Sequence, residues 1–111
     1  MRMFIPTVGT EFKLSEDWVF DLFHEYRNEK LMEHFKLLER SESGYSVYNS
    51  RESTEVTLPK GTIIKIDRIY VKKGNGAYDS VTVYAQIAGE KRKRRFWVKL
   101  NDFNQIEAED I

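Results

Sequence analysis

The sequence contains no cysteine. That absence excludes a disulfide framework, a thiolate metal site and a cysteine nucleophile. The chain has two prolines, and no apolar run reaches the length of a membrane span or of a signal-peptide core. We therefore expect a cytoplasmic protein with no membrane partner.

Catalytic and cofactor motifs are also missing. The two histidines, His24 and His34, do not have the spacing of zinc ligands. The Gly-Asn-Gly stretch at 74–76 lacks the Lys-Ser/Thr of a phosphate-binding loop and the further glycine of a dinucleotide fingerprint, so a hairpin turn explains it better. The expectation is a protein that is not an enzyme and that holds no metal or cofactor.

The residues that are present indicate a folded chain with segregated charge. A content of 41% hydrophobic and 14% aromatic residues is too high for disorder, and 111 residues favour a single domain. The net charge of zero conceals an acidic first half, with 7 Lys+Arg against 11 Asp+Glu in 1–55, and a basic second half, with 11 against 7 in 56–111. A binding surface in the second half would be cationic.

Short strands account for most of the chain. The stretches 5–14 and 58–66 both place a proline and then Gly-Thr before alternating residues, a pattern typical of entry into a strand. We predict a strand at 10–14, a largely helical insertion at 15–40, a loop at 41–55 with a short strand at 45–48, an antiparallel β-meander at 56–100 and a closing segment at 101–111. Within the insertion, residues from about Asn28 favour a helix, whereas 18–23 also fit a strand with Trp18, Phe20 and Leu22 on one face.

Strand parity assigns two faces to the meander. Val81, Val83, Ala85 and Ile87 share the core side with Phe96, Val98 and Leu100. The first meander strand changes phase, which predicts a bulge near Asp67 and Arg68. The opposite side is then predicted to carry three cross-strand rows: Arg68, Tyr84 and Arg95; Tyr70, Thr82 and Trp97; Lys72, Ser80 and Lys99.

The basic run 91–95 leads directly into a predicted strand. Alternate residues of a strand diverge, so Arg95 is expected to join Trp97 and Lys99, while Arg92 and Arg94 lie in the turn or at the edge of the core side. A targeting signal needs an accessible flexible peptide, and a run that continues into a core strand disfavours that function.

The predicted strands resemble those of an SH3-like small β-barrel, and the resemblance rests on residues 58–74, 79–87 and 94–107. It implies a mainly β (α+β) fold: a small antiparallel barrel or bent sheet of about five strands with a helical insertion after the first. The short, charged chain without a catalytic motif also looks like bacteriophage or mobile-element accessory proteins, which would place it in a host cytoplasm.

Two functions follow from these patterns. Cations bind phosphates and rigid rings stack on bases, so the leading hypothesis is a nucleic-acid or nucleotide-binding module. The alternative is a module that binds a host protein, for example an inhibitor of a host defence system, since Trp, Tyr and Arg dominate interface hot spots. The residues predicted to bind the partner are Arg68, Tyr70, Lys72, Lys73, Tyr84, Lys91, Lys93, Arg95, Trp97 and Lys99.

A third possibility removes this surface altogether. The glutamate-rich insertion has an apolar stripe that must pack against another part of the protein. If it covers the face that carries Tyr70 and Trp97, those rings belong to the core.

Overall fold

The computed structural model describes residues 7–110 except 41, 45 and 71–78, and the side chains of 39, 40, 46, 47, 50 and 110 are also left out of the description. Lys72 and Lys73 therefore lie outside the described residues. The strands are β1 (Glu11–Leu14), β2 (Trp18–His24), β3 (Glu39–Arg40), β4 (Ser46–Val47), β5 (Asn49–Leu58), β6 (Ile63–Tyr70), β7 (Ser80–Gln86), β8 (Lys93–Lys99) and β9 (Ala108–Asp110). The helices are the 3-10 turn η1 (Tyr26–Asn28), α1 (Glu29–His34) and α2 (Leu100–Phe103).

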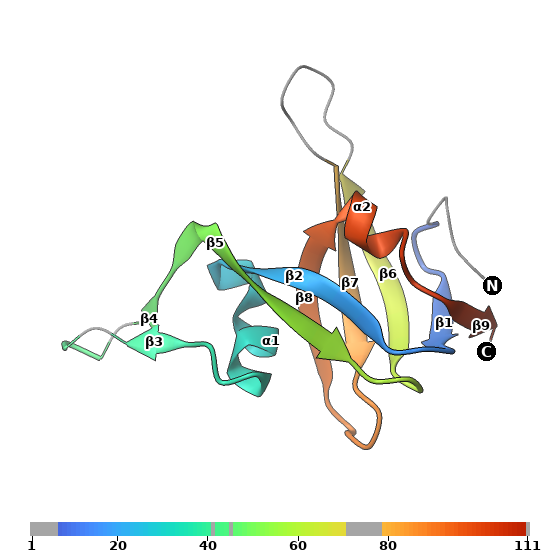
Figure 1. The fold of residues 1–111 in the computed structure, drawn as a ribbon, viewed down its shortest axis with the longest axis horizontal. Helices are drawn as coiled ribbons and strands as arrows, with labels where there is room; N and C mark the ends of the chain where they lie inside the picture. The colour runs from blue at the N-terminus through green and yellow to red at the C-terminus, as the bar shows by residue number, and fades with distance from the viewer. Residues whose placement is uncertain (1–6, 41, 45, 71–78, 111) are drawn as a thin grey trace.

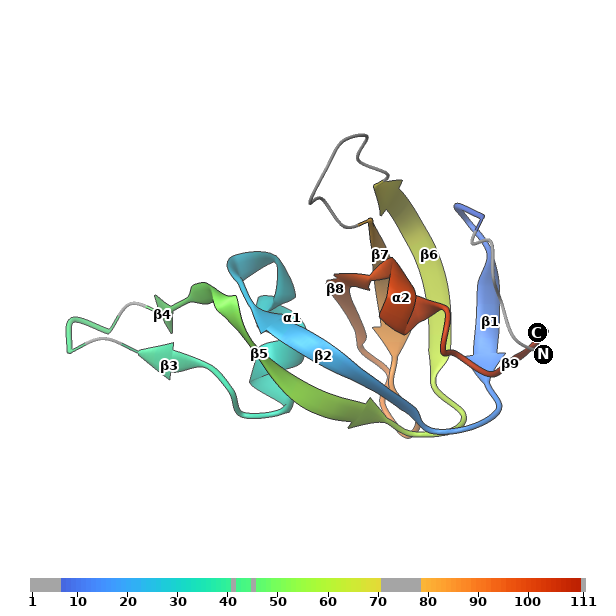
Figure 2. The same cartoon turned by 45° about the horizontal axis from the view of Figure 1, so that its top comes forward.

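The fold is mainly β, as the sequence predicts, but the strands do not close into one barrel. Five form an antiparallel sheet in the order β8-β7-β6-β1-β9. β2 and β5 form a separate two-stranded sheet, here called the ribbon, and β3 pairs with β4. Figure 1 shows the ribbon crossing in front of the sheet, and Figure 2 shows β3 and β4 projecting away from it.

The predicted strand at 10–14 and the meander are confirmed as β1 and as β6, β7 and β8. The glycines of the two strand-entry stretches, Gly9 and Gly61, have φ of 88° and 92°. Because a residue with a Cβ rarely adopts this conformation, the tight turns before β1 and β6 favour glycine.

The insertion and the loop differ from the prediction. The helical part of the insertion is confined to Tyr26–His34, and the strand alternative for 18–23 is the correct one, since Trp18–His24 form β2. The short strand predicted within the loop is present as β4 (Ser46–Val47), but the loop is wrong over 49–55, where β5 begins at Asn49. Each of these strands is stabilised by the other: β2 buries Trp18, Phe20 and Leu22 on one face, and β5 supplies its hydrogen-bond partner.

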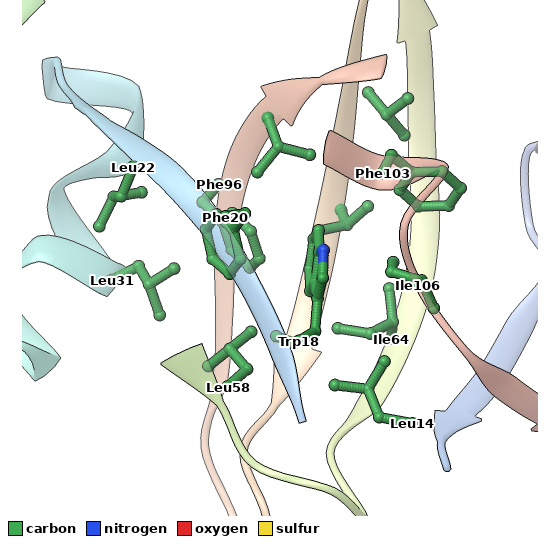
Figure 3. Packing of buried hydrophobic residues seen from close by; sticks show 14 of the residues in the cluster. Leu14, Trp18, Phe20, Leu22, Leu31, Leu58, Ile64, Phe96, Phe103 and Ile106 are labelled. Carbon is green, nitrogen blue, oxygen red and sulfur yellow. The ribbon is translucent and has the colours of Figure 1, made fainter. Parts of the chain in front are cut away.

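The core lies between the ribbon and the inner face of the sheet (Figure 3). Phe20 of the ribbon stacks on Phe96 of β8 with 5.5 Å between ring centroids and 11° between planes. Trp18 packs edge-on against Phe103 of α2, and its Nε1 donates to the backbone oxygen of Asp102 at 3.0 Å. The short helix α2 thus closes one end of the core before the chain returns as β9 beside β1.

None of the described helices is long and apolar enough to cross a bilayer.

Candidate nucleic-acid interface

The side of β6, β7 and β8 that faces away from the ribbon is called the outer face. Its β7–β8 register is the predicted one: Ser80 pairs with Lys99, Thr82 with Trp97 and Tyr84 with Arg95. The register shift between Ile66 and Arg68 confirms the predicted bulge. Beyond it, β6 is displaced by two residues from the predicted alignment, so that Arg68 pairs with Thr82 and Tyr70 with Ser80.

The observed outer face still consists of three rows, with Lys65 entering the first through its pairing with Tyr84. The rows are Lys65, Tyr84 and Arg95; Arg68, Thr82 and Trp97; Tyr70, Ser80 and Lys99. The predicted face is therefore present, although its partners across β6 have changed.

Trp97 does not contribute an open ring to this face. Its side chain is only 6% exposed, because Phe23 stacks on it with 5.1 Å between ring centroids and 9° between planes. The guanidinium of Arg27 lies 5.5 Å from the indole centroid. The expectation that Trp97 is open to water is wrong, since the end of β2 and η1 pass around β8 and reach the outer side.

Asn28 holds this cover in place. It is fully buried; its Oδ1 accepts a hydrogen bond from the backbone N–H of Trp97 at 2.8 Å, and its Nδ2 donates to the backbone oxygen of Phe23 at 3.0 Å. β8 is an edge strand, so the N–H of Trp97 points away from β7 and needs a partner from elsewhere. Asn28 supplies that partner and protects the edge of the sheet.

Sequence reasoning missed Phe23, Arg27 and Asn28, although one of them left a signal. Phe23 breaks the alternation of Trp18, Phe20 and Leu22 and puts an apolar ring on the other face of the strand. Such a ring needs a second packing partner.

Arg27 also binds the carboxylate of Glu25, and this hydrogen bond raises the pKa of the Arg27 guanidinium above its ordinary value.

The five basic residues at 91–95 separate as parity predicts. Lys91, Arg92 and Lys93 are exposed at the end of the β7–β8 hairpin. Arg94 is half-buried and structural: it donates to the backbone oxygen of Lys30 at 2.7 Å and to Glu90 at 3.2 Å, and so ties α1 to the hairpin.

The remaining cations of the outer face differ in their availability. A guanidinium nitrogen of Arg95 lies 3.2 Å from Asp67 Oδ2, and Lys99 Nζ lies 4.9 Å from the centroid of the Phe23 ring. Lys65 and Arg68 are exposed and form no ion pair with the residues that the structure describes. Together with Lys93, which is exposed in the row next to that of Arg95, these are the cations best placed to meet an anionic ligand.

Two tyrosines remain on the same face. Tyr70 is 56% exposed and Tyr84 is half-buried between Lys65 and Arg95 in its row. The insertion therefore covers part of the predicted surface, at Trp97, and leaves Tyr70 and Tyr84 in contact with solvent. Its own apolar residues, Leu31 and Met32, pack in the main core instead.

The two histidines lie in separate surroundings. His24 Nε2 is 2.7 Å from the hydroxyl of Thr54, and His34 Nδ1 is 3.3 Å from Glu90 Oε2. Among the described residues, no three His, Cys, Asp or Glu side chains gather as a metal site would require.

Comparison with protein-family models, with curated proteins and with solved structures gives no match for this chain.

Proposed function

We propose that this protein is a non-enzymatic binding module that holds single-stranded nucleic acid on the outer face of β6, β7 and β8. The observation that carries the proposal is the alignment of Lys65, Tyr84 and Arg95 in one cross-strand row, next to the exposed Arg68. Ammonium and guanidinium groups neutralise phosphates, and a tyrosine ring held by a sheet offers a base a stacking surface.

The charges of the three strands support the same ligand. β6, β7 and β8 together contain six Lys or Arg and one carboxylate, Asp67. Because Trp97 is covered, stacking on this face depends on Tyr84 and Tyr70, and phosphate contacts are expected to supply most of the affinity.

The fold proposal is an SH3-like small β-barrel that has opened on one side. The strand order β9-β1-β6-β7-β8, with three consecutive strands forming the meander, supports it. A host-cytoplasmic accessory protein of bacteriophage type is proposed on the resemblance in sequence style alone.

A protein partner is the second candidate. It is favoured by the large exposed rings Tyr26 and Tyr70, which are 66% and 56% exposed, since tyrosine is enriched at interface hot spots. In this case the module would bind a host protein, such as a component of a defence system, instead of a phosphate chain.

Fluorescence anisotropy with a labelled single-stranded oligonucleotide separates the two candidates. We expect affinity to fall steeply with salt, and the Lys65→Gln/Arg68→Gln variant to lower the slope of log affinity against log salt by about 1.4, because two phosphate contacts to a single strand are lost. The matched control is Lys30→Gln/Lys36→Gln, which removes the same charge from exposed positions of α1 and the turn after it.

Two results would contradict the proposal. One is a wild-type protein that does not bind the oligonucleotide at low salt. The other is an equal loss of affinity in the control variant, which would mean that net charge and not the outer face determines binding.

A further inference from the structure

The exposed side of the ribbon carries an unusual pair of like charges. Asp21 of β2 and Glu55 of β5 are direct register partners, and both are exposed. Like charges directly opposite each other on an antiparallel pair are destabilising. Neither carboxylate forms an ion pair within the part of the chain that the structure describes.

Neighbouring groups reinforce the negative charge of this surface. The backbone N–H of Asp21 donates to Asp102 Oδ2 at 3.1 Å, which brings a third carboxylate close to the pair. The next register pair on the same face is Val19 and Thr57, and Val19 is 47% exposed. The surface formed by Val19, Asp21, Glu55 and Thr57, here called the acidic face, thus combines unpaired charge with exposed apolar area.

The acidic face and the outer face lie on opposite sides of the molecule. The ribbon packs on the inner side of the sheet through Phe20 and Phe96, so its exposed side points away from the sheet. In Figure 1, viewed down the shortest axis, the ribbon is in front of β7 and β8, and the outer face therefore points to the back. The extent along this axis is 21 Å, against 45 and 40 Å along the others.

We infer that the acidic face binds the outer face of a second copy of this chain. The complementary cations, Lys65 and Arg68, are exposed and lack an ion-pair partner among the described residues. A second copy stacked along the short axis brings them against Asp21 and Glu55 and relieves the like-charge repulsion. Because the two surfaces differ, the contact is head-to-tail and leaves a free acidic face at one end and a free outer face at the other.

Sedimentation velocity over a range of protein concentrations tests this contact. At about 50 mM salt we expect the average mass of the wild type to rise with concentration beyond that of a dimer, and at about 500 mM salt to return to that of the monomer, since exposed charges are then screened. Two neutralised variants, Asp21→Asn/Glu55→Gln and Lys65→Gln/Arg68→Gln, should each remain monomeric at low salt.

Mixing the two variants gives the sharpest result. Each retains one intact surface, so an equimolar mixture should form a one-to-one pair that does not grow further. Circular dichroism before mixing establishes that both variants are folded.

Three outcomes would overturn the proposal. They are a wild type that remains monomeric at low salt, self-association that the two variants leave unchanged, and a mixture that does not pair. If the wild type is monomeric but an oligolysine peptide binds it and fails to bind Asp21→Asn/Glu55→Gln, the acidic face receives a foreign basic partner instead of a second copy.

Discussion

At the scale of single residues, Asn28 is the buried polar side chain that joins η1 to both β8 and the end of β2. It is fully buried, and both ends of its amide are used, one by Trp97 and one by Phe23. Burying an amide costs free energy unless its oxygen and nitrogen are both hydrogen-bonded. If the Asn28 side chain is removed, the two backbone groups that it binds are left buried without a hydrogen-bond partner.

Replacing Asn28 by alanine should lower the free energy of unfolding by about 2–3 kcal/mol, because the N–H of Trp97 and the carbonyl of Phe23 then lose their buried partner. Urea denaturation measures this change. Asn101→Ala is the matched control: Asn101 is exposed, and its loss should change stability by less than about 0.5 kcal/mol. Equal stability of the two variants would show that Asn28 does not hold the cover of β8.

The same cluster affects how binding experiments are designed. Trp97 packs under Phe23 and Arg27, so a Trp97 truncation would change folding and binding together. Lys65 and Arg68 are exposed, and their substitution reports on binding with little effect on the fold.

At the scale of elements, the ribbon is a strand pair with two chemically distinct faces. Phe20 is 2% exposed and stacks on Phe96, whereas Val19, the preceding residue, is 47% exposed. The core-facing side holds the ribbon on the sheet, and the other side is free for contact with a partner.

Phe20→Ala should therefore cost about 3–5 kcal/mol of unfolding free energy, through lost burial and the cavity that remains. Val19→Ala should lower the free energy of unfolding by less than about 0.5 kcal/mol, because the Val19 side chain is already 47% exposed to solvent. Thermal or urea unfolding of the two variants compares the faces directly. A similar cost at both positions would mean that the ribbon does not pack on the sheet through its even-numbered residues.

The elements also show what can be predicted from the sequence. The alternation in β7 and β8 is strong enough to predict their register. Each strand has one apolar face, which carries Val83 in β7 and Phe96 in β8, and a short turn joins the two strands. β5 was missed because its first half is polar, rich in Ser and Glu, and becomes a strand by pairing with β2. Local propensity carries little information about such a distant partner.

The candidate site was predictable to a similar degree. Parity placed Tyr84, Arg95 and Lys99 on one face, and the structure keeps them there, with Tyr84 and Arg95 in one row and Lys99 two rows away. The burial of Trp97 could not be derived in the same way, because it depends on the path that β2 and η1 take around the edge of β8. That path is a tertiary property, set by long-range contacts.

At the scale of the whole molecule, the zero net charge results from two opposed surfaces. β2 and β5 contain three carboxylates and one cation, and β6, β7 and β8 contain six cations and one carboxylate. Folding places Asp21 and Glu55 on one side of a thin molecule and Lys65, Arg68 and Arg95 on the other, so the charge asymmetry of the sequence becomes an asymmetry in space. Both the proposed ligand and the proposed self-contact depend on this arrangement.

The central claim is that the outer face of β6, β7 and β8 binds single-stranded nucleic acid. Its most direct test is a titration of isotope-labelled protein with an unlabelled oligonucleotide, followed by two-dimensional NMR of the backbone amides. The account predicts that, at a protein concentration low enough for the chain to be monomeric, the largest shifts fall at Lys65, Arg68 and Tyr84 and the amides of Val19, Asp21 and Glu55 remain unchanged. Shifts concentrated on the ribbon, or the absence of any shift at low salt, would contradict it.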